Sequence, residues 1–469
     1  MCMVNEIFEI NYTKCIEPVY GEKRNVYEDN KITKNISEKH EYSIDIDERI
    51  SMIEHEVYSI DPDGCEDADD AFSIYIDNSK LYLAIHIADP TEYIKLNSDL
   101  WNNIVKRTTT KYPSNRKPIH MIPDDIMRLS SLKGINEIKN AITVLTEIDK
   151  DSYIPIGEVK LLFSKVLVKL ENSYSYKEAS EKKEMEVLKT GLKISKGLQE
   201  IRAKNTKGVK LNELSLAYTR FNNDEIYLYQ DTEEEKEMRQ MISEFAIFAN
   251  SFVGEYLKNT LNTGIFRTCD AQDWLKNTSD TITGEEMIQQ IITNGITADY
   301  LSNIKSHDLV GMPEYCHFTS PIRRLADCVC HYLLKYVYFN NKNLISNIPF
   351  TDYELQILSN SCLSATKQDK KNQYLDIKFR LLQVMDAIIR ENNSLILEYY
   401  ITSYSGLFLN IIICKINDYN VHMSYTLRTR NYCIKRNASE HKKIVCTKVN
   451  CFTKYDQGCI PELDKILLF

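Results

Sequence analysis

The stretch SIDPDGCEDADDAFSI, residues 59 to 74, is the sequence feature that most constrains the fold of this chain. It places five aspartates and one glutamate within ten positions, with Pro62 and Gly64 between them and apolar, strand-like residues on both sides. Like charges this close together repel each other strongly unless a cation or solvent relieves them. We therefore expect one strand to end at Asp61, a turn to follow, and a second strand to begin near Asp70.

The aspartates of this stretch have the chemistry of a hard-cation site. Period-two alternation puts Asp67 and Asp69 on one face, and a local bend would bring Asp61 and Asp70 toward them. Carboxylate oxygens without His or Cys ligands favour Mg²⁺, or Mn²⁺, over zinc. A calcium-binding EF-hand fits poorly, because counting from Asp61 places Glu66 where that loop needs glycine and Phe72 where it needs glutamate. A solvated acidic loop is the other alternative.

The length and composition of the chain limit the classes of protein to which it can belong. A chain of 469 residues with 43% hydrophobic residues can bury the cores of two or three domains. It has no apolar run of about 18 residues and no signal-like start, so we expect no membrane span and a cytoplasmic location. Thirteen cysteines without a C-x-x-C pair indicate reduced thiols. The net charge of −9 repels nucleic acid, so any nucleic-acid site must be local.

The chain divides into three parts by pattern. Residues 1–45 are polar and typical of an extension or linker. Residues 46–392 alternate strand-like runs, including a hairpin over 71–89 and a strand over 142–149, with helical patterns over 233–258 and 374–392. Residues 393–469 are rich in Tyr, Ile and Val in short alternating runs, which predict a small β-barrel. The sequence identifies no protein partner.

The stretch HFTSPIRRLADCVCHYLL, residues 317 to 334, carries two adjacent arginines. Pro321 and the apolar spacing after it predict a helix with Arg323 and Arg324 in its first turn. Because a helix N-terminus prefers anions, this placement favours a bound phosphate, although a pair of surface salt bridges is the alternative. Glu244 lies on the apolar stripe of the helix expected over 233–258, which indicates a partner, a ligand or a boundary position.

Together these motifs resemble the RNB family of 3′→5′ exoribonucleases. The resemblance covers about residues 46–392 and follows the family order through SIDPDGCEDADDAFSI, LAIHIADPTEYI, RTTTKYPSNRKPIHMIP, ENSYSYKEA, ISEFAIFAN and HFTSPIRRLADCVCHYLL. It implies an α+β fold, in which an RNB catalytic domain with a mixed sheet packed with helices precedes an S1/OB-like β-barrel over 393–469. It also implies a magnesium-dependent hydrolase that takes single-stranded RNA from its 3′ end and releases nucleoside 5′-monophosphates.

The resemblance assigns roles position by position. The four active-site aspartates of the family match Asp61, Asp67, Asp69 and Asp70, of which we expect Asp69 to serve catalysis and the other three to hold the metal. Arg323 matches the arginine at the scissile phosphate. The expected RNA contacts are Tyr112 on the RNA path, Tyr176 at the terminal bases and Glu244 at the 3′ nucleoside.

This sequence departs from the family pattern at two positions. Leu325 stands where the family has tyrosine, and Tyr332 stands where it has arginine. The competing hypothesis is an RNB-fold RNA-binding or scaffold protein without turnover, and the presence of all four aspartates with Arg323 favours the enzyme.

Overall fold

The computed structural model describes residues 39–114, 118–204, 216–222, 225–277, 296–446, 449–450, 462–463 and 466–468. Most of the extension expected over 1–45 therefore lies outside the described residues. Its last part does not lie apart from the fold, because Tyr42 and Ile44 are buried in the main core. Tyr42 packs edge-on against Tyr332, at 5.7 Å between ring centroids.

The centre of the fold is a five-stranded mixed sheet with the strand order β1-β6-β5-β4-β3. Its members are β1 (Ile50–Ser51), β3 (Asp70–Asp77), β4 (Lys80–Ala88), β5 (Glu137–Ile148) and β6 (Pro155–Val168). All neighbours are antiparallel except β1 and β6. The hairpin predicted over 71–89 is confirmed as β3 and β4, because Asn78 and Ser79 both adopt positive φ and close a two-residue turn between Asp77 and Lys80.

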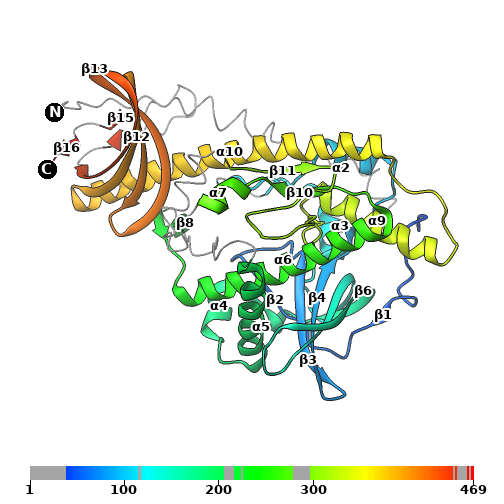
Figure 1. The fold of residues 1–469 in the computed structure, drawn as a ribbon. Coiled ribbons are helices and arrows are strands. Elements are labelled where there is room, and N and C mark those ends of the chain that lie inside the picture. Colours follow the sequence, from blue (N-terminus) through cyan, green and yellow to red (C-terminus); the bar gives the residue numbers. More distant parts are fainter. Residues whose placement is uncertain are drawn as a thin grey trace.

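Helices cover this sheet (Figure 1). The described α-helices are α2 (Asp99–Arg107), α3 (Asp124–Ser130), α4 (Tyr176–Glu181), α5 (Glu186–Ala203), α6 (Glu233–Leu261), α7 (Gln272–Asn277), α9 (Leu325–Asn341) and α10 (Asp352–Asn392). Short 3-10 turns lie at η2 (Pro90–Glu92) and η3 (Leu170–Asn172). The helix predicted over 233–258 is confirmed as α6, which begins at a capping box between Thr232 and Glu235 and ends at Asn262 in the left-handed conformation.

Helix α10 is 41 residues long, more than twice the predicted length, and runs along one side of the molecule (Figure 1). Its first part contributes Leu355, Leu358 and Cys362 to the main core. Its last part contributes Phe379 and Met385, among others, to a second core beneath the strands that follow. The helix therefore connects two hydrophobic cores, and the polar segment between them faces the loops of the central domain.

The small barrel expected over 393–469 is not confirmed, and no closed barrel forms within the described residues. Strands β12 (Leu395–Ile416) and β13 (Tyr419–Cys446) form one long curled hairpin, to which β16 (Ile466–Leu468) adds a third strand. The short alternating runs of the sequence are segments of these two strands, interrupted by register shifts such as that between Tyr404 and Gly406. Bulges of this kind break the alternation without ending the strand.

The remaining strands form two-stranded pairs. They are β2 (Ser59–Asp61) with β7 (Ser173–Ser175), β8 (Tyr218–Asn222) with β9 (Glu225–Tyr229), β10 (Phe266–Cys269) with β11 (Ala298–Leu301), and β14 (Val449–Asn450) with β15 (Glu462–Leu463). None of the helices in the described residues combines the length and apolar character needed to cross a bilayer.

Candidate active site

The acidic stretch forms the connection between β2 and β3, as predicted. Strand β2 ends at Asp61, and a turn follows in which the Cys65 amide donates to the Pro62 carbonyl at 3.1 Å. Gly64 sits in this turn at φ 75°, a conformation that glycine adopts without strain. The backbone carbonyl of Asp69 accepts a bond from the Ala88 amide at 2.8 Å, so the end of β4 fixes the second half of the turn.

Asp69 is the point where the acidic turn meets the arginine segment. Its carboxylate accepts the Ile322 amide at 2.8 Å and Arg323 Nε at 2.9 Å. Asp69 is 3% exposed, and a second Arg323 nitrogen donates to the Ser320 hydroxyl at 2.9 Å. Although burial opposes it, the Asp69 carboxylate raises the pKa of Arg323 above its ordinary value. Two segments separated by 254 positions are therefore joined through a charge-assisted contact.

The arginines do not lie in a helical first turn, which corrects the sequence prediction. Helix α9 begins only at Leu325, and Arg324 precedes it in extended conformation. The backbone of this segment pairs instead with the loop before Tyr112, since the Thr110 amide donates to the Arg323 carbonyl at 3.0 Å and the Leu325 amide donates to the Thr108 carbonyl at 2.9 Å. Arg323 thus lies in a turn after Ser320 and Arg324 is extended, so the helix starts only after both arginines.

Tyr112 contacts the acidic turn from the other side. Its hydroxyl donates to Asp67 Oδ2 at 2.8 Å, while its side chain is 39% exposed. Burial of the hydroxyl and the Asp67 charge raise the pKa of Tyr112. Tyr112 therefore combines a fixed hydroxyl with an accessible ring, an arrangement that leaves the ring face free for a base.

The raised pKa values of Asp61 and Asp70 show that their ionised forms are destabilised in the cluster. Burial, together with the neighbouring Asp70 carboxylate, raises the pKa of Asp61 to about 7. Burial likewise raises the pKa of Asp70 to about 6, against the opposing charges of Arg323 and Arg324. Asp61 Oδ2 is buried without a hydrogen-bond partner. A buried carboxylate oxygen without a donor, beside a second carboxylate, has the chemistry that a hard divalent cation would satisfy.

The side chains are not gathered into a complete coordination sphere. Within the described chain, no three His, Cys, Asp or Glu side chains lie close enough together to hold a metal ion. Asp69 is held by its two donors and Asp67 by Tyr112 and Cys65. The donor set fits Mg²⁺ or Mn²⁺ best at Asp61 and Asp70, while Asp67 and Asp69 would have to exchange partners to join them.

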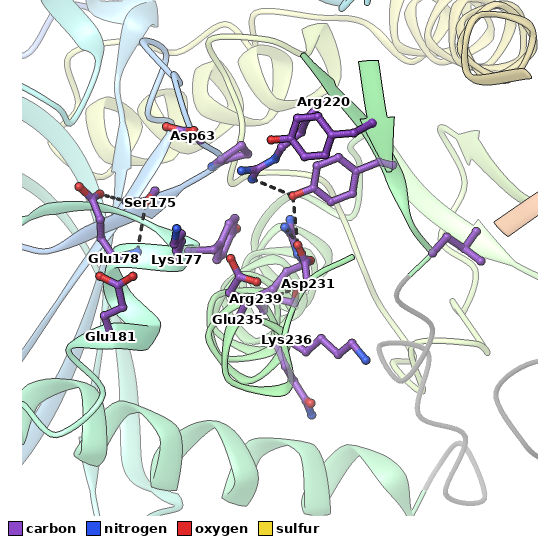
Figure 2. Close-up of a pocket in the computed structure, with 17 residues that line it drawn as sticks. Asp63, Ser175, Lys177, Glu178, Glu181, Arg220, Asp231, Glu235, Lys236 and Arg239 are labelled. Carbon is purple, nitrogen blue, oxygen red and sulfur yellow. Dashed lines mark hydrogen bonds and ion pairs between the residues drawn. The ribbon is translucent and has the colours of Figure 1, made fainter. Parts of the chain in front are cut away.

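Tyr176 lines a cavity of about 1000 Å³, which also contains Ser175, Arg220 and Arg239 (Figure 2). It is the first residue of α4, and burial together with the Asp70 charge raises the pKa of its hydroxyl. The Arg239 guanidinium lies 4.2 Å from the centre of its ring. Pro62 and Asp63, which continue the acidic turn, also line the cavity, so one turn serves both the aspartate cluster and the cavity.

Glu244 is not brought to the cavity. It is 1% exposed and forms a two-point ion pair with Arg202 of α5, at 3.1 Å from Nε and 2.5 Å from the other nitrogen. The carboxylate on the apolar face of α6 therefore has a protein partner, one of the readings the sequence left open. Its contact with a 3′ nucleoside stays a prediction.

Sequence reasoning missed the residues that hold the Tyr112 loop. The Ser114 amide and hydroxyl donate to the two oxygens of Asp376 at 2.7 and 2.5 Å, and Arg380 Nε donates to the Ser114 hydroxyl at 2.7 Å. Asp376 and Arg380 are both nearly fully buried in α10. The available signal was a pair of opposite charges four residues apart on a helix, which is usually a solvated ion pair.

The two departures from the family pattern lie in the core. Leu325 is fully buried at the start of α9. Tyr332 is also fully buried, and its hydroxyl donates to the Ile94 carbonyl. Both residues therefore serve packing here rather than the site.

Comparison with known proteins places this geometry in a family. The RNB domain model matches residues 49–340. Ribonuclease R of Ureaplasma parvum is 24% identical over 437 residues, which cover 80% of this chain and 57% of the relative. Exoribonuclease 2 of Buchnera aphidicola is 28% identical over 344 residues, which cover 64% of this chain and 52% of the relative. The chain thus spans only about half the length of these curated relatives.

Solved structures share the fold. Mycoplasma genitalium RNase R in complex with ribose methylated single-stranded RNA superposes with a TM-score of 0.71 at 17% identity, covering 96% of this chain and 76% of that chain. Yeast Ssd1, described as a pseudonuclease, superposes with a TM-score of 0.64 at 17% identity, covering 81% of this chain and 50% of that chain. The fold is an α+β domain of the RNB type. The chain belongs to the RNB family.

Proposed function

We propose that this protein is a hydrolytic 3′→5′ exoribonuclease that acts on single-stranded RNA and releases nucleoside 5′-monophosphates. The observation that carries the proposal is the contact of Asp69 with Arg323, which joins four clustered aspartates to a cation able to hold a phosphate. The relatives named as ribonuclease R and exoribonuclease 2 support the same activity.

In this proposal the residues divide the chemistry between them. Asp61 and Asp70, joined by Asp67, would hold Mg²⁺ or Mn²⁺, which when bound supplies Lewis-acid activation of the phosphodiester and of water. Arg323 neutralises charge on the phosphoryl oxygens, and Asp69 orients Arg323 through its Nε. Tyr112 and Tyr176 stack on bases at roughly 1–3 kcal/mol each without selecting a sequence. Glu244 would have to leave its ion pair with Arg202 to contact the 3′ nucleoside.

A second candidate is an RNB-fold RNA-binding protein without turnover. The observation in its favour is that Asp69 and Asp67 are already hydrogen-bonded within the protein, as they would be if no metal were needed. Yeast Ssd1 is a relative in fold that is described as a pseudonuclease. The buried, partnerless Asp61 oxygen favours the enzyme, because a binding protein gains nothing from it.

The test is degradation of 5′-labelled single-stranded RNA with magnesium, with and without a chelator. The enzyme should shorten this RNA stepwise from the 3′ end and release nucleoside 5′-monophosphates, and the chelator should abolish the reaction. RNA carrying a bulky group at its 3′ end should survive, and DNA of the same sequence should be degraded poorly. Cleavage of circular RNA would reject an exonuclease, and binding without degradation would favour the second candidate.

A further inference from the structure

The cavity beside the acidic turn extends beyond Tyr176. Its volume of about 1000 Å³ lies at the upper end of the roughly 300–1,000 Å³ range of small-molecule sites. A nucleoside stacked on Tyr176 would therefore leave part of the cavity open. The far wall of that part is the β8–β9 hairpin, which brings in Tyr218, Arg220 and Tyr227.

Arg220 is held in a fixed orientation on this wall. Its guanidinium lies 3.9 Å from the centre of the Tyr229 ring, and one of its terminal nitrogens donates to the Tyr218 hydroxyl at 2.9 Å. The Tyr218 hydroxyl in turn donates to Asp231 Oδ1 at 3.1 Å. The other Asp231 oxygen accepts Arg239 Nε at 3.0 Å, and Arg239 covers the ring of Tyr176. The wall and the stacking residue thus form one connected unit.

Arg220 differs from Arg239 and Lys236 of the cavity in its partners. Arg239 is paired with Asp231 and Lys236 with Glu233. In the part of the chain that the structure describes, no carboxylate lies within 4.0 Å of Arg220, and Asp63 acts on it only at longer range. Lys177, which also lines the cavity, likewise forms no ion pair among the described residues. A flat, stacked guanidinium with N–H donors left over is suited to bind an oxyanion.

The position of Arg220 relative to the aspartates identifies which anion it meets. The acidic turn runs from Asp61, beside the aspartate cluster, to Asp63, in the cavity with Arg220. If the scissile phosphate lies at Arg323 and the terminal base stacks on Tyr176, the 3′ oxygen of the last nucleoside points away from Asp69, into the rest of the cavity. A group attached to that oxygen would meet the far wall.

We propose that Arg220 binds the terminal phosphate of RNA that ends in a 3′-phosphate, so that such ends are accepted as substrates. This inference rests on the proposed function. In the first cycle an oxygen from water bonds to phosphorus, and the bond from phosphorus to the 3′ oxygen of the preceding nucleoside breaks. That oxygen takes up a proton. The products are a nucleoside 3′,5′-bisphosphate and RNA with a 3′-hydroxyl, for which Arg220 is no longer needed.

Binding of small products tests the proposal without turnover. Calorimetric titration would compare adenosine 3′,5′-bisphosphate with adenosine 5′-monophosphate on the full chain. The bisphosphate should bind roughly tenfold more tightly, the size of one charge-assisted hydrogen bond. Arg220→Ala should remove this preference, and Arg220→Lys should keep part of it. Equal affinities in the unaltered protein, or a preference that survives Arg220→Ala, would overturn the proposal.

Arg390→Ala is the matched control, because Arg390 is an exposed arginine of α10 paired with Asp386, outside the cavity. It removes one positive charge as Arg220→Ala does and should keep the preference for the bisphosphate. The melting temperature of each variant shows that it is folded, and Arg220→Lys provides a second variant if Arg220→Ala is unstable. Loss of the preference in Arg390→Ala would show a general charge effect and overturn the assignment to Arg220.

Degradation of matched RNAs completes the test. With 5′-labelled RNA, Arg220→Ala should slow the first cleavage of a 3′-phosphate end about tenfold and leave a 3′-hydroxyl end unchanged. If Arg220→Ala instead slows the first cleavage only of RNAs that end in guanine, with either a 3′-phosphate or a 3′-hydroxyl, Arg220 recognises a base and the proposal is overturned. If the bisphosphate preference is present but neither RNA is degraded, the proposed function fails while the binding assignment stands. If both RNAs are degraded equally with and without Arg220, only the inference fails.

Discussion

Asp69 is the residue on which the site depends most directly. Asp67 contacts only side chains, those of Tyr112 and Cys65, whereas Asp69 contacts both the backbone and the guanidinium of the arginine segment. Asp69 therefore sets the position of Arg323 and also adds negative charge beside Asp67 and Asp70. The variant Asp69→Asn keeps the size of the side chain and one acceptor oxygen, which can still bind the Ile322 amide, while it removes the negative charge and the oxygen that accepts Arg323 Nε.

We expect Asp69→Asn to slow single-turnover RNA decay by on the order of 100-fold or more, about 2.7 kcal/mol of transition-state stabilisation. RNA binding should persist or tighten, since Arg323 is released from its carboxylate partner and one repulsive charge is gone. The measurement is decay of labelled RNA beside equilibrium binding of the same RNA, at matched salt and magnesium. Asp273→Asn, at a carboxylate on α7 that is almost fully exposed, is the control. Decay within twofold of the unaltered protein would show that Asp69 is not catalytic.

Among the helices and strands, the sequence predicted those whose positions depend on residues close together in the chain. The β3–β4 hairpin follows from alternation and a short polar turn, and the start of α6 follows from its capping box. The extended backbone at Arg324 could not be predicted, because the partners of its neighbours Arg323 and Leu325, at Thr110 and Thr108, lie more than 200 positions away. The predicted barrel is not confirmed within the described residues, since register shifts within β12 and β13 have the same sequence pattern as turns between short strands.

Helix α10 is the element whose role was least visible in the sequence. Its buried Asp376 and Arg380 fix Ser114, two residues after Tyr112. Tyr112 in turn reaches Asp67 of the acidic turn. We therefore interpret Asp376 as a positioning residue that acts on RNA through Tyr112. The same part of α10 also packs against the β12–β13 hairpin (Figure 1).

A double-mutant cycle tests this positioning role. Tyr112→Phe and Asp376→Ala should each lower kcat/KM on RNA by about tenfold, and the double variant should lose little more than either single variant. A coupling of about 1.4 kcal/mol is then expected, because both changes disturb one contact at Asp67. Asp386→Ala, on the same helix but paired with Arg390, is the control. If the losses in kcat/KM are additive, or if kcat/KM falls only in proportion to the melting temperature, Asp376 contributes to stability only.

The whole molecule carries a net charge of −9, which bears on how it can hold RNA. A negative overall field slows the approach of a polyanion, so affinity has to come from a few local cations and from stacking on aromatic rings. Arg323 is paired with Asp69 and would exchange this contact for a phosphate, whereas Arg220 has N–H donors left over and feels Asp63 only at longer range. Binding should therefore depend on few phosphate contacts and show a shallow dependence on salt.

Salt titration measures the number of these contacts directly. For single strands the slope of log affinity against log salt changes by about 0.7 for each phosphate neutralised. In an Asp69→Asn background, which limits turnover, Arg323→Gln should reduce the magnitude of this slope by roughly 0.7, whereas Arg390→Ala should leave it unchanged. The measurement is equilibrium binding of labelled RNA over a range of salt at fixed magnesium. Because stacking on Tyr112 and Tyr176 involves no counterion release, Tyr176→Ala should weaken binding without altering the slope. A slope that Arg323→Gln does not change would show that Arg323 contacts no phosphate and that the acidic turn alone defines the site.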